Sequence, residues 1–205
     1  MRVVLASASP RRRELLAALI SGFDVTPADI DEPLGTDAVA DATGLAGEKA
    51  RYVAAQRPGD MIVGADTVVF DEHALYGKPG SPDEGRVMLR ALRGRDHSVV
   101  TAIAVAWDGH VGTDASVATV TLRQLSDEEV ERYLESGVPL DKAGAYAIQH
   151  EALPVVEALD GCYCGVMGLP LWRLKRLLES GGARCGDPAA VYARCATCPD
   201  RPTPG

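Results

Sequence analysis

Three consecutive arginines, Arg11 to Arg13, stand at the start of a predicted helix in the segment LASASPRRRELL. Ser7 and Ser9 precede them, and Ser9 followed by Pro10 is typical of an N-cap and a first helical residue. Because the helix dipole already places positive charge at this end, arginines there are unfavourable unless an anion binds. Hydroxyls, backbone N–H groups and guanidinium groups together predict a polyphosphate site. A solvated basic turn that Ser9 merely caps is the alternative.

A second group of candidate residues is acidic. Glu32 lies in a loop with two aspartates, and Asp66 follows the apolar stretch from Met61 to Gly64. Open α/β sheets bind ligands at the carboxyl ends of their strands, where Asp66 is expected. Since Mg²⁺ takes one or two carboxylates together with substrate phosphates, Glu32 and Asp66 are candidate metal ligands. The alternatives are a solvated acidic loop and a turn that Asp66 caps.

Lysines form a third group: Lys49 in a predicted helix, Lys78 in Gly77-Lys78-Pro79 and Lys142 in PLDKAGAYAIQ. A lysine beside an attacked phosphoryl group stabilises the developing charge, although a single lysine is more often a surface residue. The motifs GxxxxGK[ST] and GxGxxG are absent, which argues against P-loop and dinucleotide-binding proteins. The four histidines have no ligand spacing and are predicted to be structural or exposed.

The elements that must position these residues alternate between strands and helices. Predicted strands cover residues 2–6, 23–25, 61–70, 98–107, 111–122 and 153–159, and predicted helices cover 38–56, 83–92 and 169–178. Two more helices begin at Pro10 and after Ser126, which forms a capping box with Glu129. Asp108-Gly109 predicts a hairpin turn between the fourth and fifth strands. The order predicts one compact α/β protein.

Composition limits the class of protein further. With 205 residues, 46% of them apolar and 24% charged, the chain has the composition of an ordinary globular protein. The net charge of -8 argues against nucleic-acid binding, which depends on neutralising phosphates. We expect no membrane partner and a cytoplasmic location, because no apolar stretch could span a bilayer and no secretory signal is evident.

Five cysteines raise the question of disulfides or zinc. Their odd number and the lack of an export signal predict reduced thiols. Cys195 and Cys198 form one CxxC pair, but a structural zinc site needs four ligands, and the C-terminal segment adds only Cys185. Free thiols are therefore the interpretation, and zinc is the less favoured alternative.

Seven segments in chain order resemble the Maf family of nucleotide pyrophosphatases: LASASPRRRELL, EKA, IVGADTVV, GKP, LRGRDHSVVTAIAV, PLDKAGAYAIQ and VMGLP. Each motif alone is weak, whereas their ordered agreement from Val4 to about Leu178 is specific. The resemblance implies an α/β, elongated mixed-sheet fold with two lobes around a central cleft, similar to inosine triphosphate pyrophosphatases. A Maf-like pyrophosphatase domain is expected over residues 1–180. Residues 181–205, rich in Cys, Pro and Gly and without a period, are expected to form a flexible tail.

The resemblance also implies roles for single residues. Water attacks the α-phosphate and releases pyrophosphate, with Asp66 as the proton acceptor and Lys78 as a second catalytic residue. Glu32 and Asp66 bind a divalent cation, Mg²⁺, Mn²⁺ or Co²⁺, and no organic cofactor is needed. Four side chains are expected to hold the triphosphate: Ser7, Arg11, Lys49 and Lys78.

The family divides into a branch that acts on dTTP and UTP and a branch that acts on 7-methyl-GTP. Arg12 in SPRR, Thr67 in GADT and Gln149 in AIQ have the pattern of the first branch. The Gln149 amide can both donate and accept hydrogen bonds at a pyrimidine edge. This implies a housecleaning role on the nucleotide pool, with modified pyrimidine nucleotides as further substrates. The alternative is a non-catalytic regulator of septum formation, and the resemblance is compatible with a homodimer.

Overall fold

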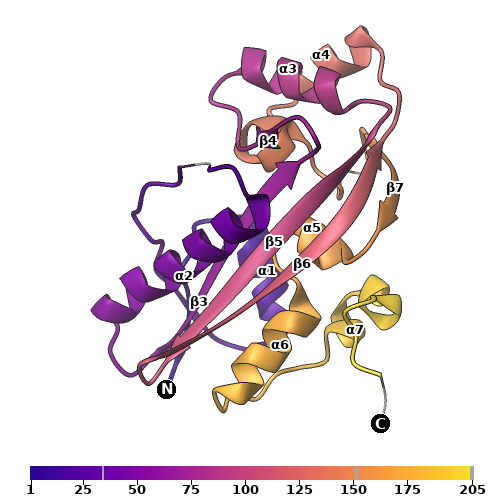
Figure 1. The fold of residues 1–205 in the computed structure, drawn as a ribbon. Coiled ribbons are helices and arrows are strands. Elements are labelled where there is room, and N and C mark those ends of the chain that lie inside the picture. Colours follow the sequence, from indigo (N-terminus) through magenta and orange to yellow (C-terminus); the bar gives the residue numbers. More distant parts are fainter. Residues whose placement is uncertain (34, 151, 204–205) are drawn as a thin grey trace. The chain divides into compact units, whose positions relative to one another are not determined.

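The computed structural model describes residues 1–33, 35–150 and 152–203, and its strands form one mixed sheet (Figure 1). The strand order is β2-β1-β3-β5-β6-β7, with β4 paired to β3. β1 runs parallel to β2 and β3, whereas β3 with β4 and β6 with β7 are antiparallel. The strands are β1 (Val3–Leu5), β2 (Asp24–Val25), β3 (Met61–Phe70), β4 (Leu75–Tyr76), β5 (Asp96–Trp107), β6 (His110–Leu122) and β7 (Val156–Asp160).

Helices alternate with these strands, as the α/β class predicted from the sequence requires. The α-helices are α1 (Pro10–Ala17), α2 (Ala38–Gln56), α3 (Pro82–Leu92), α4 (Asp127–Glu135), α5 (Tyr163–Met167), α6 (Leu171–Ser180) and α7 (Pro188–Val191). Three short 3-10 helices complete the set: η1 (Val138–Asp141), η2 (Ala143–Ala145) and η3 (Ala193–Thr197).

The chain divides into two compact units. Unit 1 contains residues 1–67, 100–117 and 161–205, and unit 2 contains residues 68–99 and 118–160. The core of unit 1 includes Leu15, Leu16 and Ile62, whose side chains are fully buried. In unit 2, Leu89 of α3 and Leu122 of β6 are equally buried. Each unit therefore has an apolar core of its own.

A glycine allows α2 to lie directly on β3 within unit 1. A Cβ atom at Gly64 would lie 2.2 Å from the carbonyl oxygen of Ala46 and 2.9 Å from the backbone nitrogen of Ala50. Backbone atoms of a helix can approach a strand this closely only where the side chain is absent. Gly64 thus sets the distance between β3 and the helix face that carries Lys49.

Most of the elements predicted from the sequence are confirmed. α2 and β3 have the predicted bounds, Ser9 caps α1, and Ser126 forms its capping box with Glu129. Asp108 and Gly109 have φ values of 43° and 79°, as a type I′ hairpin turn requires.

Several short elements of the structure and one strand start differ from those predicted from the sequence. β4, α5 and the 3-10 helices were not predicted. The last strand begins at Val156 rather than at residue 153, because the Leu153 N–H donates to His150 Nδ1 and the Pro154 carbonyl accepts from Arg123. The two domain bounds stay a prediction. Within residues 181–203, however, the structure forms α7 and η3, and residues 204 and 205 lie outside the described part.

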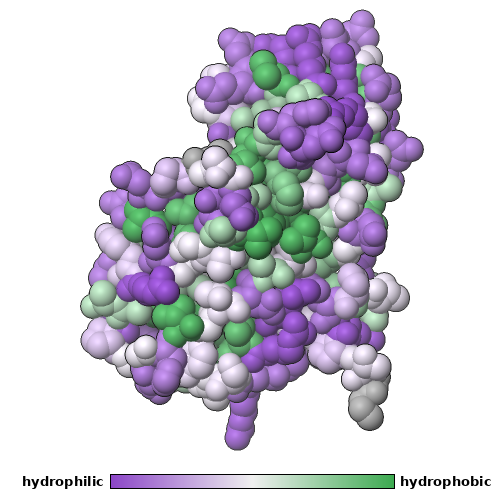
Figure 2. All heavy atoms as spheres, in the orientation of Figure 1, coloured by the Kyte–Doolittle hydropathy of each residue, from purple (hydrophilic) through white to green (hydrophobic). Residues whose placement is uncertain are grey.

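Hydrophilic side chains cover most of the face seen in Figure 2, with hydrophobic ones among them. Large exposed hydrophobic residues are spread over separate elements, such as Val39 and Tyr52 on α2, Val87 on α3 and Val191 on α7. No helix within the described ranges is long and apolar enough to cross a membrane.

Candidate active site

Lys49 joins two of the predicted acidic residues in unit 1. Its Nζ atom lies 2.7 Å from Asp66 Oδ1 and 2.8 Å from Glu32 Oε1. Lys49 and Asp66 are only 4% and 6% exposed, while the Glu32 side chain is 40% exposed. Helix α2, strand β3 and the loop before α2 thus bring one cation and two carboxylates together. Buried charges of this kind are stable only when they are paired.

Asp66 lies in the middle of β3, as the predicted strand over residues 61–70 implies, and not at the carboxyl end of the strand where the sequence led us to expect a catalytic group. The parallel pairing of β3 with β1 ends at Leu5 and Val63, and the Ala6 N–H donates to the Val63 carbonyl oxygen just beyond it. β3 continues because it has another neighbour in the sheet, β5. Asp66 therefore still lies just past the carboxyl end of β1, where open α/β sheets place their ligands.

The Arg12 side chain connects three parts of unit 1. Its Nε donates to the Gly168 carbonyl oxygen at 3.0 Å, Nη1 donates to the Ala65 carbonyl oxygen at 2.9 Å, and Nη2 donates to Thr67 Oγ1 at 3.0 Å. A further, longer bond of 3.4 Å joins Nη1 to Ser7 Oγ. The guanidinium group thus links the loop before α1, strand β3 and the end of α5.

The pKa of Arg12 also depends on these surroundings. Burial of the guanidinium lowers the pKa of Arg12, the charges of Asp66 and Glu32 raise it in part, and the charge of Arg11 lowers it further. Arginine remains protonated in proteins, so Arg12 is a fixed positive charge. The same balance shows that Arg12 is electrostatically coupled to both carboxylates that Lys49 binds.

Threonines extend this hydrogen-bond network toward β5 and α5. Thr67 Oγ1 lies 2.9 Å from Thr101 Oγ1, and Thr101 donates to the Gly165 carbonyl oxygen at 2.8 Å. Sequence reasoning did not single out Thr101 or Gly168. A threonine inside a strand is ordinary, so only its two hydrogen bonds distinguish Thr101 from other strand residues.

The predicted phosphate-binding serines and arginines gather at the start of α1. Ser7 is 9% exposed, and its Oγ accepts from the Ser9 backbone N–H at 3.3 Å. Ser9 Oγ in turn accepts from the Arg12 N–H at the first turn of the helix. Arg11 is half-buried and Arg13 is exposed. The structure therefore brings seven predicted residues into one part of unit 1: Ser7, Arg11, Arg12, Glu32, Lys49, Asp66 and Thr67.

The other predicted residues belong to unit 2. Lys78 is exposed between β4 and α3, and Gln149 is half-buried after η2. Their participation in the site stays a prediction. Lys142, a further candidate from the sequence, donates to the Val138 carbonyl oxygen at 2.6 Å and pairs with Asp141. These contacts favour a local structural role for Lys142.

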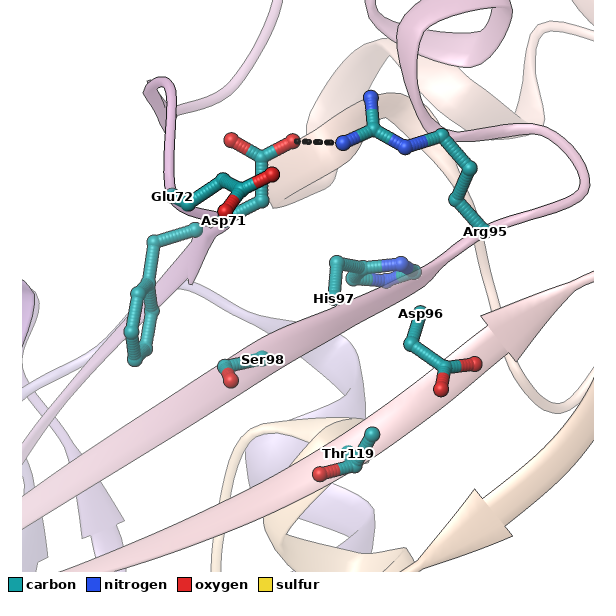
Figure 3. A pocket seen from close by; sticks show the side chains of 8 residues that line it. Asp71, Glu72, Arg95, Asp96, His97, Ser98 and Thr119 are labelled. Atoms are coloured by element: carbon teal, nitrogen blue, oxygen red, sulfur yellow. Dashed lines mark ion pairs between the residues drawn. The ribbon is translucent and has the colours of Figure 1, made fainter.

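A pocket of about 380 Å³ lies within unit 2 (Figure 3). Asp71 and Arg95 face each other there at 3.7 Å, and His97 lies on the strand below them. Burial lowers the pKa of His97 to about 4, so the ring is neutral near pH 7 and its Nε2 shares a 2.7 Å hydrogen bond with the Tyr146 hydroxyl. The lining residues are Phe70, Asp71, Glu72, Arg95, Asp96, His97, Ser98 and Thr119. The pocket includes none of the predicted site residues.

Comparison with known proteins gives a consistent result. The family model described as Maf-like protein matches residues 2–181. A dTTP/UTP pyrophosphatase of Thermomicrobium roseum is 47% identical over 207 aligned residues, which cover 98% of this chain and 95% of the relative. The dTTP/UTP pyrophosphatases of Myxococcus xanthus and Chromobacterium violaceum are 47% and 45% identical, each over 88% of this chain and over 92% and 95% of their own. The first alignment extends well past residue 181, into the C-terminal segment.

Proposed function

Because the chain belongs to the Maf family, we propose that it hydrolyses nucleoside triphosphates, dTTP and UTP among them, to the monophosphate and pyrophosphate. The activities named for these relatives support the reaction class and the choice of nucleotides. The enzyme would act on the nucleotide pool in the cytoplasm, with modified pyrimidine nucleotides as further substrates.

The two ion pairs of Lys49 are the observation that carries this proposal. These ion pairs hold the buried carboxylate of Asp66 beside the Lys49 ammonium group and the second carboxylate, Glu32. In the proposed reaction, Asp66 accepts a proton from water while the water oxygen attacks the α-phosphorus. The bond between the α-phosphorus and the oxygen bridging to the β-phosphate breaks, and pyrophosphate leaves with that oxygen. Preorganised positive charge supplies most of the stabilisation in such phosphoryl reactions.

The donor set fits a divalent cation. Glu32 and Asp66 contact the same Nζ atom, so their oxygens lie close enough together to face one ion that prefers oxygen ligands. We assign Mg²⁺, Mn²⁺ or Co²⁺ to these two residues. When bound, the ion offsets the negative charge of the triphosphate and lowers the pKa of nearby water.

The triphosphate would bind at the start of α1. Backbone N–H groups, the Ser7 hydroxyl and Arg11 lie at this helix terminus, where the dipole favours an anion. Lys49 and Lys78 add the remaining positive charge in the proposal. Lys78 belongs to unit 2, so its part is to be tested by substitution.

Nucleotide choice is assigned to Arg12, Thr67 and Gln149. Three of the guanidinium nitrogens of Arg12 already donate to protein acceptors. We therefore treat Arg12 as a positioning residue that holds Ser7 and Thr67, and we assign the direct reading of the pyrimidine edge to Gln149.

The proposed function is tested by incubating the purified protein with Mg²⁺ or Mn²⁺ and dTTP, UTP, CTP, GTP or 7-methyl-GTP. The kcat/KM for pyrophosphate release should be at least about tenfold higher for dTTP and UTP than for the other nucleotides. The reason is that the other bases cannot form at least one of the hydrogen bonds that the site makes with the edge of thymine or uracil. A preference for 7-methyl-GTP would contradict the roles of Arg12, Thr67 and Gln149. No release from any nucleotide would contradict the enzyme.

Arg12→Lys should lower kcat/KM for dTTP by about 10- to 100-fold, because an ammonium group cannot reproduce the fork that reaches Gly168, Ala65 and Thr67. Steady-state kinetics of pyrophosphate release measure the change. Arg13→Lys, in the same helix turn but exposed, is the matched control and should stay within about twofold of the wild type. Equal activity of the two variants would remove Arg12 from the site.

A further inference from the structure

Four of the five cysteines gather at one place in unit 1. Cys162 caps α5 and Cys164 lies in its first turn, while Cys195 lies in η3 and Cys198 follows it. The four residues are between 1% and 9% exposed. Cys164 Sγ and Cys195 Sγ are 3.5 Å apart. The sulfurs of Cys162 and Cys198 and a carboxylate oxygen of Asp200 lie within 4.8 Å of one another.

The four sulfurs form two close pairs, Cys164 with Cys195 and Cys162 with Cys198. Around one zinc ion with Zn–S bonds of about 2.3 Å, tetrahedral sulfurs lie about 3.8 Å apart, close to the observed separation of Cys164 and Cys195. Cys162 and Cys164 form a CxC motif, and Cys195 and Cys198 form a CxxC motif. Together they supply the four ligands that a structural zinc site needs, which residues 181–205 alone cannot supply.

Two of these cysteines are among the few buried residues of the C-terminal segment. Of the described residues 181–203, only Pro188, Cys195 and Cys198 are buried. α7 and η3 span four and five residues, too few to be stable as isolated helices. A segment with so small an apolar core usually requires a covalent or metal cross-link.

The surroundings suit an anionic centre, since four thiolates and one Zn²⁺ carry a net charge of about -2. The Arg194 guanidinium lies 4.4 Å from the centre of the Tyr163 ring. Tyr163 stands between the two cysteines of the CxC motif in the sequence. Arg173 binds Asp200 Oδ1 at 2.7 Å, and Ser116 donates to Asp200 Oδ2 at 2.9 Å. Both oxygens of Asp200 thus have partners in the protein, and four thiolates complete the ligand set of a structural Zn²⁺, so we assign Asp200 as a neighbour of the ligands.

We propose that Cys162, Cys164, Cys195 and Cys198 bind one structural Zn²⁺ ion, which fixes residues 181–203 to α5 and α6. The Trp172 Nε1–H of α6 supports this arrangement by donating to the Cys195 carbonyl oxygen at 2.8 Å, and Figure 1 shows the segment beside α6. Binding releases the four thiol protons to solvent, so zinc affinity falls as the pH falls. The site stands apart from the proposed hydrolysis and requires no nucleotide.

Zinc content tests the proposal on the full-length chain, purified with reductant in Zn²⁺-supplemented medium. Mass spectrometry of the metal should give about one Zn per chain in the wild type and at least a tenfold lower content in Cys195→Ser and Cys198→Ser. Cys185→Ser, a cysteine outside the cluster, and Asp200→Asn should both retain the ion. Loss of zinc from Asp200→Asn but not from Cys164→Ser would overturn the four-sulfur assignment.

Two measurements on the wild type keep the test independent of how the variants fold. Replacing zinc with Co²⁺ should give thiolate-to-cobalt charge-transfer bands and the strong visible bands of a tetrahedral site. Chelation should make trypsin cleavage after Arg184 and Arg194 at least about tenfold faster, as local opening of the segment predicts. A metal-free chain whose denatured form shows one reactive thiol instead of five would indicate disulfides and overturn the zinc site.

Discussion

An Asp66→Asn protein should release pyrophosphate from dTTP and UTP about 10³-fold more slowly than the wild type, in kcat. The asparagine amide has nearly the same shape but cannot accept the proton of the attacking water, a function that contributes about 10²- to 10⁴-fold in rate. It also removes one of the two carboxylates that Lys49 contacts at 2.7 and 2.8 Å, and with it one ligand of the proposed cation. Initial rates at saturating nucleotide and metal give the comparison.

Asp60→Asn provides the matched control. Asp60 lies immediately before β3 and pairs with Arg57 near the surface, so its replacement should leave kcat within about twofold. Circular dichroism of Asp66→Asn should confirm a folded protein. If Asp66→Asn kept more than a tenth of the wild-type kcat, Asp66 would not be the proton acceptor. The same variant separates hydrolysis from a role in septum formation, because a purely regulatory protein would still act on septum formation after the loss of hydrolysis.

Gly64→Ala should lower the free energy of unfolding by more than about 3 kcal/mol. The added methyl group would lie 2.2 Å from a carbonyl oxygen and 2.9 Å from a backbone nitrogen of α2, and neither atom belongs to a flexible side chain that could turn away. Helix and strand must separate, which opens a packed core; overpacking costs about 1–3 kcal/mol even where side chains can adjust. Chemical denaturation of both proteins measures the difference.

Gly44→Ala, in the helix that packs against Gly64, is the contrasting change. A Cβ at Gly44 meets no atom within 4 Å, and the residue is exposed in the interior of α2, so this variant should gain up to about 1 kcal/mol in stability. Opposite signs for the two substitutions would establish that the close approach of backbone atoms at Gly64, and not the added methyl group as such, controls this interface. A loss below about 1 kcal/mol for Gly64→Ala would mean that α2 can move away from β3 freely. Displacing α2 also displaces Lys49, so Gly64→Ala should lose activity as well.

Elements with strong local signals were predictable from the sequence. The bounds of α2 and β3, the Ser9 cap and the Ser126 capping box follow from patterns within a few residues. The residue types of the site were also identified, because lysine, carboxylates and arginine beside a helix start indicate phosphate chemistry. Short elements such as α5 and η3 carry no periodic signal, so they depend on tertiary contacts that a linear pattern does not contain.

The partners of the site residues were not predictable. Lys49 was expected to hold phosphate, yet in this structure it binds Asp66 and Glu32, each 17 residues away in opposite directions along the chain. That meeting depends on the approach of α2 to β3 at Gly64. The cysteine cluster is similar, because Cys164 and Cys195 are 31 residues apart. A search for zinc ligands confined to the C-terminal segment therefore finds too few.

The burial of Lys49 and Asp66 also limits how this protein can diverge over generations. Replacing only one of the two by an uncharged residue leaves the other with less compensation inside the protein, and breaking a buried ion pair costs about 3–5 kcal/mol. That is a large share of the total stability of a typical domain. A lineage that abandoned the chemistry would thus lose less stability by losing both charges together than by losing either one alone. The pair should consequently persist in descendants even after selection for hydrolysis has ended, as a relic of the reaction.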